Sequence, residues 1–287
     1  MILRPSNQIR LATVNTFFDG VDVSTLSPLQ WLYLHFDVFR GSDKLMRKYQ
    51  EMRSVSHPIE AVIRDKDPDI IVVNEVVVGQ PDSKSLEVLK ENGYKFRATG
   101  CDPNPNDVFE RNTLVASRLA GEELSVDIQQ FPGGRFCALQ FKSMNFVVIG
   151  VQGSPFNGMV RKAQIKTVFD YIDKLVSQNI NVIAAGDFNL SLKNSSLTNG
   201  NIFYYSARSF PSPEFYKKLK SKGFFQTIMR LGLGLKNGPR RLDHILFSKG
   251  LKCLKREPFE TCSDHMALYA EFNAGQSISE TRRDLSV

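Results

Sequence analysis

The segment Val182-Ile183-Ala184-Ala185-Gly186-Asp187-Phe188-Asn189 decides how this sequence folds. It begins with an apolar run of strand length and ends with a glycine, a carboxylate and an amide. An apolar run without alternating polar residues is typical of a strand that is buried on both faces. In folds built from such strands, functional groups collect where the central strands end. The segment therefore predicts a core strand that presents Asp187 and Asn189 at its carboxyl end.

Three further apolar runs, at 9–14, 70–73 and 146–151, are also of strand length and have the same kind of ending. The polar residues that follow them are Asn15, then Asn74 and Glu75, then Gln152. Helical patterns separate the runs, and the clearest has an apolar stripe along 163–177. A hairpin is also expected around 111–141, with Pro132-Gly133-Gly134 as its turn. Strands that alternate with helices beside a hairpin predict an α/β sandwich of mixed sheets.

The composition fits one globular domain. Hydrophobic residues make up 42% of the 287 residues, which is enough for a large core. We expect this domain to span 1–274, with an insertion near 24–56 and a polar tail at 275–287. Apolar and then basic residues at 26–53 predict either a helix packed on the sandwich or a membrane contact. Because no stretch has the pattern of a signal peptide or a membrane span, we expect a soluble, intracellular protein. We also expect it to be a monomer.

The formal net charge of +7 favours an anionic partner such as nucleic acid, an acidic membrane surface or a phosphorylated metabolite. A charge surplus that serves only solubility is the alternative. The four cysteines include no C-x-x-C pair, so the sequence indicates neither a zinc knuckle nor a redox motif.

Glu75 follows a probable core strand, where burying a carboxylate is costly unless a cation or hydrogen bonds compensate. A metal ion is the economical explanation. Asp187 and Asn189 are two residues apart, so on an extended segment they face the same side. A carboxylate and an amide suit the orientation of a water molecule and a phosphoryl oxygen. A purely structural turn is the alternative reading of Gly-Asp-x-Asn.

Two histidine motifs lie near the carboxyl end. Asp243 precedes His244 after a basic pair, and Ser263-Asp264-His265 precedes an alternating apolar segment. A buried histidine needs a carboxylate to fix its tautomer and favour its protonated form, and Asp243 is a candidate partner for His265. The alternative is that His265 is an ordinary packing residue.

Taken together, the order and context of these motifs resemble the endonuclease/exonuclease/phosphatase superfamily. That superfamily includes DNase I-like nucleases, abasic-site endonucleases, inositol polyphosphate phosphatases and neutral sphingomyelinases. The matching motifs span 15–268, and Gly186-Asp187-Phe188-Asn189 with a downstream Ser263-Asp264-His265 is the most specific part. The resemblance implies a DNase I-like, four-layered α/β sandwich: two mixed β-sheets flanked by helices, with one site at the sheet tops.

The resemblance also implies roles for these residues in a hydrolase. Glu75 resembles the principal ligand of Mg²⁺ or Mn²⁺, assisted by Asn15 and Asp264. Asp187 resembles the group that orients or deprotonates the attacking water, and Asn189 resembles a group that holds the phosphate.

His265, oriented by Asp243, resembles the residue that contacts the phosphoryl oxygens. Arg111, Asn112 and Arg135 are weaker candidates for phosphate contacts, and surface ion pairs are the alternative for the arginines.

One departure from the superfamily pattern concerns Gln152, where many relatives have a Thr-His-Leu-like segment or a tyrosine. Gln152 can hydrogen-bond a phosphate but cannot act as a general acid. The leading hypothesis is a nuclease or nucleic-acid phosphodiesterase, supported by basic residues near the site such as Arg111, Arg135, Arg240 and Arg241. The alternatives are a phosphoinositide phosphatase or sphingomyelinase-like lipid phosphodiesterase, and a pseudoenzyme that retains the fold as a binding scaffold.

Overall fold

The four apolar runs at 9–14, 70–73, 146–151 and 182–185 form strands in the computed structural model, which describes residues 8–16, 57–77, 83–101, 111–124, 135–154, 158–192, 202–207, 213 and 241–274. The strands are β1 (Gln8–Asn15), β2 (Ile70–Val77), β3 (Phe96–Cys101), β4 (Arg111–Ser117), β5 (Glu122–Leu124), β6 (Arg135–Phe141), β7 (Phe146–Gln152), β8 (Asn181–Asp187), β9 (Ile202–Ser206), β10 (Asp243–Ser248), β11 (Lys252–Phe259) and β12 (Ala267–Asn273). The helices are α4 (Pro58–Lys66), α5 (Lys84–Glu91), α6 (Gly158–Ser177) and the short 3₁₀ helix η1 (Lys142–Met144). The expected insertion near 24–56 and the tail at 275–287 lie outside the described residues.

The described strands form two six-stranded sheets. Sheet I has the order β11-β12-β1-β2-β4-β3, and sheet II has the order β5-β6-β7-β8-β10-β9. The central pairs β1–β2 and β7–β8 are parallel, whereas the other described pairs are antiparallel. The prediction of mixed sheets is therefore confirmed.

The hairpin expected around 111–141 forms only in part, because β5 and β6 pair antiparallel while β4 joins the other sheet, and the expected turn at 132–134 lies outside the described residues. β4 lies between β2 and β3 in sheet I, whereas β6 lies in sheet II and pairs with β5 and β7. A Pro-Gly-Gly segment marks a turn but does not specify which strands pair across it. The short β5, which the sequence analysis did not anticipate, takes the place beside β6.

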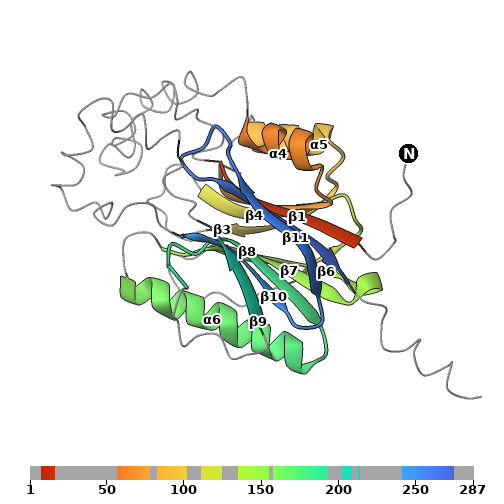
Figure 1. Ribbon diagram of the computed structural model, residues 1–287, viewed down its shortest axis with the longest axis vertical. Helices are drawn as coiled ribbons and strands as arrows, with labels where there is room; N and C mark the ends of the chain where they lie inside the picture. The colour runs from red at the N-terminus through yellow and green to blue at the C-terminus, as the bar shows by residue number, and fades with distance from the viewer. Residues whose placement is uncertain are drawn as a thin grey trace, which may run out of the picture.

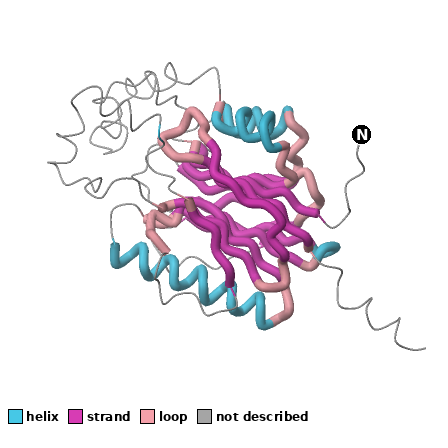
Figure 2. Tube along the Cα trace, in the orientation of Figure 1, coloured by secondary structure: helices cyan, strands magenta, loops and turns pink. Residues whose placement is uncertain are grey.

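The two sheets stack face to face, with α4 and α5 covering the outer face of sheet I and α6 covering that of sheet II (Figures 1 and 2). The four-layered α/β sandwich implied by the resemblance is thus confirmed. An apolar layer fills the space between the sheets, with contributions such as Leu11, Val72, Val148 and Ile183. Connections between parallel strands must cross over a sheet face, which explains why α6 lies outside β7 and β8.

Helix α6 follows from the apolar stripe in the sequence, because Ile165, Val168, Phe169 and Ile172 are buried against sheet II. Among the helices that the structure describes, none has the length and apolarity needed to span a membrane. The carboxyl ends of β1, β2, β7 and β8 meet at one edge of the sandwich, joined by hydrogen bonds between the sheets. This edge carries the polar residues predicted from the sequence.

Candidate active site

One row of polar side chains crosses the end of sheet II. The strand register places Arg135 opposite Gln152, Gln152 opposite Asp187, and Asp187 opposite Asp243. Residues in register on neighbouring strands point to the same face, and the strands lie about 4.8 Å apart. Residues far apart in the sequence are thus brought side by side, on the face that looks toward sheet I.

Glu75 reaches the same region from sheet I through a β-bulge. The register of β2 against β4 shifts between Asn74 and Val76, and Glu75 has a φ of 62°. Left-handed backbone is strained for a glutamate, and a bulge redirects the side chain that it carries. As a result, Oε1 of Glu75 accepts hydrogen bonds from Nδ2 of Asn15 at 3.3 Å and Nε2 of Gln152 at 3.4 Å.

The second carboxylate oxygen of Glu75, Oε2, is buried and has no hydrogen-bond partner among the described residues. A buried carboxylate oxygen without a partner is costly, and a divalent cation would offset that cost. Oxygen ligands of this kind are the ones that Mg²⁺ and Mn²⁺ prefer. The donor set around Glu75 therefore fits such an ion.

Asp187 ends β8 and is held by Asn189. The backbone N–H of Asn189 donates to Oδ1 of Asp187 at 2.8 Å, and its side-chain Nδ2 donates to Oδ2 at 3.0 Å. The same Nδ2 also donates to the carbonyl oxygen of Gly153 at 3.1 Å. The expectation of an extended segment is wrong, because Asn189 has a φ of 49° and a turn brings it back to Asp187. In this arrangement Asn189 orients Asp187, and its expected contact with phosphate stays a prediction.

The environment of Asp187 raises the pKa of its carboxyl group to about 7. Burial is the largest cause, and the charge of Asp243 adds to it, while His265 and the hydrogen bond from Asn189 act in the opposite direction. The charge of Glu75 raises the pKa further. A carboxyl group with this pKa can exchange a proton near neutral pH.

His265 lies directly before β12, and its Nδ1 is 2.7 Å from Oδ2 of Asp243. The hydroxyl of Ser263 accepts a hydrogen bond from the backbone N–H of His265 at 3.2 Å and donates to Oδ1 of Asp264 at 3.3 Å. Burial acts to lower the pKa of His265, but the carboxylates of Asp243, Asp264 and Asp187 outweigh it and hold that pKa well above its ordinary value. These carboxylates therefore favour the protonated form of His265.

Donor atoms of Asp187, Asp243 and His265 all lie within 4.8 Å of one another. Three such groups can in principle hold a metal ion. Here a protonated imidazole that is hydrogen-bonded to Asp243 repels a cation and attracts an anion. The group therefore suits a phosphoryl oxygen better than a metal, and the buried oxygen of Glu75 is the better place for the cation.

The remaining predicted residues line the same end of the sheets. Nη1 of the buried Arg135 donates to Oε1 of Gln152 at 3.2 Å, so Gln152 links Arg135 to Glu75. Asn112 is buried at the start of β4, opposite Val76. The side chain of Arg111 lies outside the described part of the chain.

Sequence reasoning missed two positioning groups. Asn74 is fully buried between the sheets, and its amide contacts both of them. The signal was a polar residue at an inward-facing position directly after an apolar run. His244 is also buried, and its Nε2 donates to the carbonyl oxygen of Leu190 at 2.8 Å, which anchors the turn after Asn189. Burial lowers the pKa of His244 to about 4, so this ring stays neutral.

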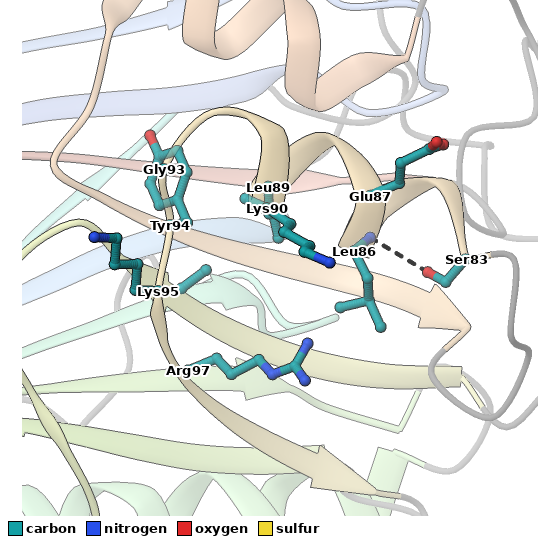
Figure 3. A pocket seen from close by; sticks show the side chains of 10 residues that line it. Ser83, Leu86, Glu87, Leu89, Lys90, Gly93, Tyr94, Lys95 and Arg97 are labelled. Atoms are coloured by element: carbon teal, nitrogen blue, oxygen red, sulfur yellow. Dashed lines mark hydrogen bonds between the residues drawn. The ribbon is translucent and has the colours of Figure 1, made fainter.

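A pocket of about 880 Å³ lies elsewhere, between α5 and the outer face of β3. Figure 3 shows Leu86, Lys90 and Arg97 extending toward the same space. Arg97 pairs with Ala116, far from the end of β4 that carries Asn112. The lining of this pocket includes Glu87 but no histidine, so the polar site at the sheet ends remains the candidate for chemistry.

Solved structures share this fold at low sequence identity. TDP2 from C. elegans superposes with a TM-score of 0.58 and 14% identity, covering 93% of this chain and 75% of its own. The human Nocturnin catalytic domain superposes with a TM-score of 0.55 and 18% identity, covering 94% of this chain and 96% of its own. ANGEL2 is described as a 2′,3′-cyclic phosphatase and was solved with adenosine-2′,3′-vanadate. It superposes with a TM-score of 0.56 and 14% identity, covering 92% of this chain and 95% of its own. The search of curated protein sequences gave no significant match.

The sequence profile of the Endonuclease/Exonuclease/phosphatase family matches residues 46–265, which is most of the chain and includes Glu75, Asp187 and His265. The fold and the sequence profile agree. The chain therefore belongs to the Endonuclease/Exonuclease/phosphatase family.

Proposed function

We propose that this protein is a phosphodiesterase of nucleic acid that works with Mg²⁺ or Mn²⁺. The observation that carries the proposal is the meeting of two groups at one end of the sandwich. One is the buried, unpartnered oxygen of Glu75, and the other is the group formed by Asp187, Asp243 and His265. Hydrolysis of a phosphate ester needs both positive charge on the phosphoryl oxygens and an activated water.

Glu75 is the residue that we assign to the metal ion, with Asn15 and Asp264 assisting directly or through water. When bound, the ion supplies positive charge that stabilises the phosphoryl oxygens. Asn15 already contacts Glu75, and Asp264 is buried beside His265.

Asp187 is the group that we assign to the attacking water. Its raised pKa suits a general base, because a base is most effective when its pKa lies near the working pH. Asn189 fixes both carboxylate oxygens, so the base does not have to be oriented during the reaction.

His265 is the group that we assign to the phosphoryl oxygens. Asp243 binds Nδ1, which directs the remaining N–H, on Nε2, to an anionic oxygen. Gln152 and Arg135 add hydrogen-bond donors on the neighbouring strands.

Nucleic acid is the substrate that the charge favours. The chain carries a net charge of +7, and the buried Arg135 lies in the row of site residues. The similarity to ANGEL2, solved with a vanadate derivative of adenosine, gives further support for a nucleotide substrate. The membrane contact considered for 26–53 lies outside the described residues and adds nothing to the choice.

The test is a substrate panel of single-stranded DNA, RNA, inositol polyphosphate, sphingomyelin and bis(p-nitrophenyl) phosphate, each assayed with Mg²⁺, Mn²⁺ and EDTA. We expect metal-dependent cleavage of nucleic acid that weakens steeply as salt is added. Glu75→Gln and His265→Ala should abolish it. Asp170→Asn is the matched control, because Asp170 is an exposed carboxylate of α6 paired with Lys166. Preferential turnover of a lipid or inositol substrate would rule out nucleic acid as the main substrate. Inactivity on the whole panel would rule out the proposed phosphodiesterase activity.

A further inference from the structure

The amide of Asn74 joins the two sheets directly beneath the candidate active site. Asn74 belongs to sheet I, yet its Nδ2 donates to the carbonyl oxygen of Val151 at 2.9 Å and its Oδ1 accepts the backbone N–H of Asp187 at 3.0 Å. Val151 and Asp187 belong to β7 and β8 of sheet II. Nδ2 also donates to Oγ1 of Thr113 within sheet I at 3.1 Å. All three of these hydrogen bonds are buried, so Asn74 has a fixed position.

This position matters because the proposed chemistry is divided between the sheets. Glu75 follows Asn74 in the chain and belongs to sheet I, whereas Asp187 belongs to sheet II. Most of the layer between the sheets is apolar, and longer hydrogen bonds across it join Gln152 to Glu75 at 3.4 Å and the Cys137 thiol to the carbonyl oxygen of Thr113 at 3.5 Å. Apolar packing is non-directional, while hydrogen bonds constrain both distance and angle. The two bonds of Asn74 to sheet II therefore hold Glu75 and Asp187 in register.

Gly186 makes room for this connection. It has a φ of 137°, and a Cβ atom placed on it would lie 2.1 Å from the carbonyl oxygen of Val151 and 3.0 Å from Oδ1 of Asn74. That carbonyl oxygen is the one that accepts from Asn74. Any side chain at position 186 would displace one or both partners. The glycine of the Gly-Asp-x-Asn motif thus has a role that the sequence alone did not reveal.

We infer that Asn74, seated by Gly186, is a positioning residue that sets the separation between Glu75 and Asp187. It touches neither substrate nor metal and acts by holding the two sheets at a fixed distance. The inference rests on the proposed function for its kinetic consequences, while its structural part can be measured without turnover.

The test compares Asn74→Leu, whose side chain has the same branching and number of heavy atoms but no polar atoms, with Gly186→Ala, which keeps Asn74 but places a methyl group against its contacts. Thr113→Val is the matched control, since it removes one buried hydrogen bond of Asn74 within sheet I and leaves both bonds to sheet II. Circular dichroism verifies folding of each variant. Three quantities are measured: kcat and KM on bis(p-nitrophenyl) phosphate, Mn²⁺ affinity by calorimetry, and hydrogen exchange of the Asp187 amide.

We expect kcat to fall about 100-fold in Asn74→Leu and Gly186→Ala with little change in KM, because a misplacement of about 1 Å costs that much. Mn²⁺ affinity should fall about tenfold, as it does when groups that orient a ligand are lost. The Asp187 amide should exchange faster in both variants. Thr113→Val should keep its kcat within about threefold of wild type, since one neutral hydrogen bond contributes modestly.

Wild-type kcat and Mn²⁺ affinity in folded Asn74→Leu would overturn the inference. A loss in Thr113→Val equal to that in Asn74→Leu would also overturn it, because the effect would then be general destabilisation. If Asn74→Leu does not fold, the same three quantities are compared between Gly186→Ala and the control Thr113→Val, and the same outcomes support or overturn the inference. If wild type has no phosphoesterase activity, the proposed function fails, while Mn²⁺ affinity and amide exchange still decide on Asn74.

Discussion

Nδ1 of His265 and Oδ2 of Asp243 lie 2.7 Å apart, and both side chains are buried. The two residues are 22 positions apart in the sequence. Asp243 is the first residue of β10, and His265 lies in the segment before β12. A buried pair in this geometry fixes the ring orientation and keeps the imidazole protonated. The pair therefore gives the site a positive group beside the carboxylates.

Asp243→Asn should remove this effect. We expect kcat to fall about 100-fold, which is the scale of a lost acid–base or charge-stabilising group. The pKa of His265 should drop, because Asp243 is the largest contributor that raises it and burial then dominates. Steady-state kinetics gives the first quantity and NMR titration of the ring gives the second. An unchanged ring titration in Asp243→Asn would contradict the assignment, and Asp170→Asn serves as the control.

Glu75→Gln should separate metal binding from folding. The amide has the same shape but lacks the charge, so Mn²⁺ affinity should fall by at least about tenfold. Mn²⁺ should raise the melting temperature of the wild type, because a ligand that binds only the folded state stabilises it, and this rise should disappear in the variant. Calorimetry and thermal unfolding measure the two effects. Glu87→Gln, on the exposed face of α5, should retain both, and equal Mn²⁺ binding by Glu75→Gln would place the ion elsewhere.

The strands of this fold could be predicted from the sequence because their signal is local. The runs at 9–14, 70–73, 146–151 and 182–185 fall within β1, β2, β7 and β8, since continuous apolar sequence requires burial on both faces. The placement of β4 between β2 and β3, away from β5 and β6, could not be predicted, because the choice of partner strand depends on the whole sandwich.

The candidate site was predictable as a set of residues but not as a geometry. Glu75 points into the site only because a bulge places it at positive φ, and Asn189 turns back on Asp187 for the same backbone reason. For Glu75 the sequence carries no sign of this conformation, whereas for Asn189 the only sign is that Gly-Asp-x-Asn can form a turn. Asn74 was missed because a polar residue after an apolar run looks like a strand end, whereas its partners lie on the other sheet.

The raised pKa of Asp187 predicts how metal-free stability depends on pH. The carboxyl group has a pKa of about 7 in the folded protein against 3.8 ordinarily, so the folded state holds the proton more tightly than the unfolded state. Its contribution is fully present below about pH 4 and is lost as the pH rises through about 7. Relative to wild type, Asp187→Asn should therefore gain stability across this window, on the order of 4 kcal/mol.

Urea unfolding in EDTA at several pH values between these limits measures the difference in free energy of unfolding between Asp187→Asn and wild type. The difference should grow with pH and level off above neutrality. Asp170→Asn, which removes an exposed carboxylate, should show a nearly flat difference over the same range. A difference for Asp187→Asn that does not change with pH would mean that Asp187 ionises normally in the folded protein.

Gln152 predicts a strong dependence on the leaving group. Its amide connects Arg135 to Glu75 but has no proton to transfer, so the leaving oxygen departs without help from this position. Across a series of aryl phosphodiesters, log kcat should fall steeply as the pKa of the leaving phenol rises. Gln152→Ala should lower kcat about tenfold by releasing Arg135 and Glu75, as loss of an orienting partner does. The slope of the series should stay the same, because no proton passes through residue 152. A steeper slope in Gln152→Ala would instead show that the amide stabilises charge on the leaving oxygen.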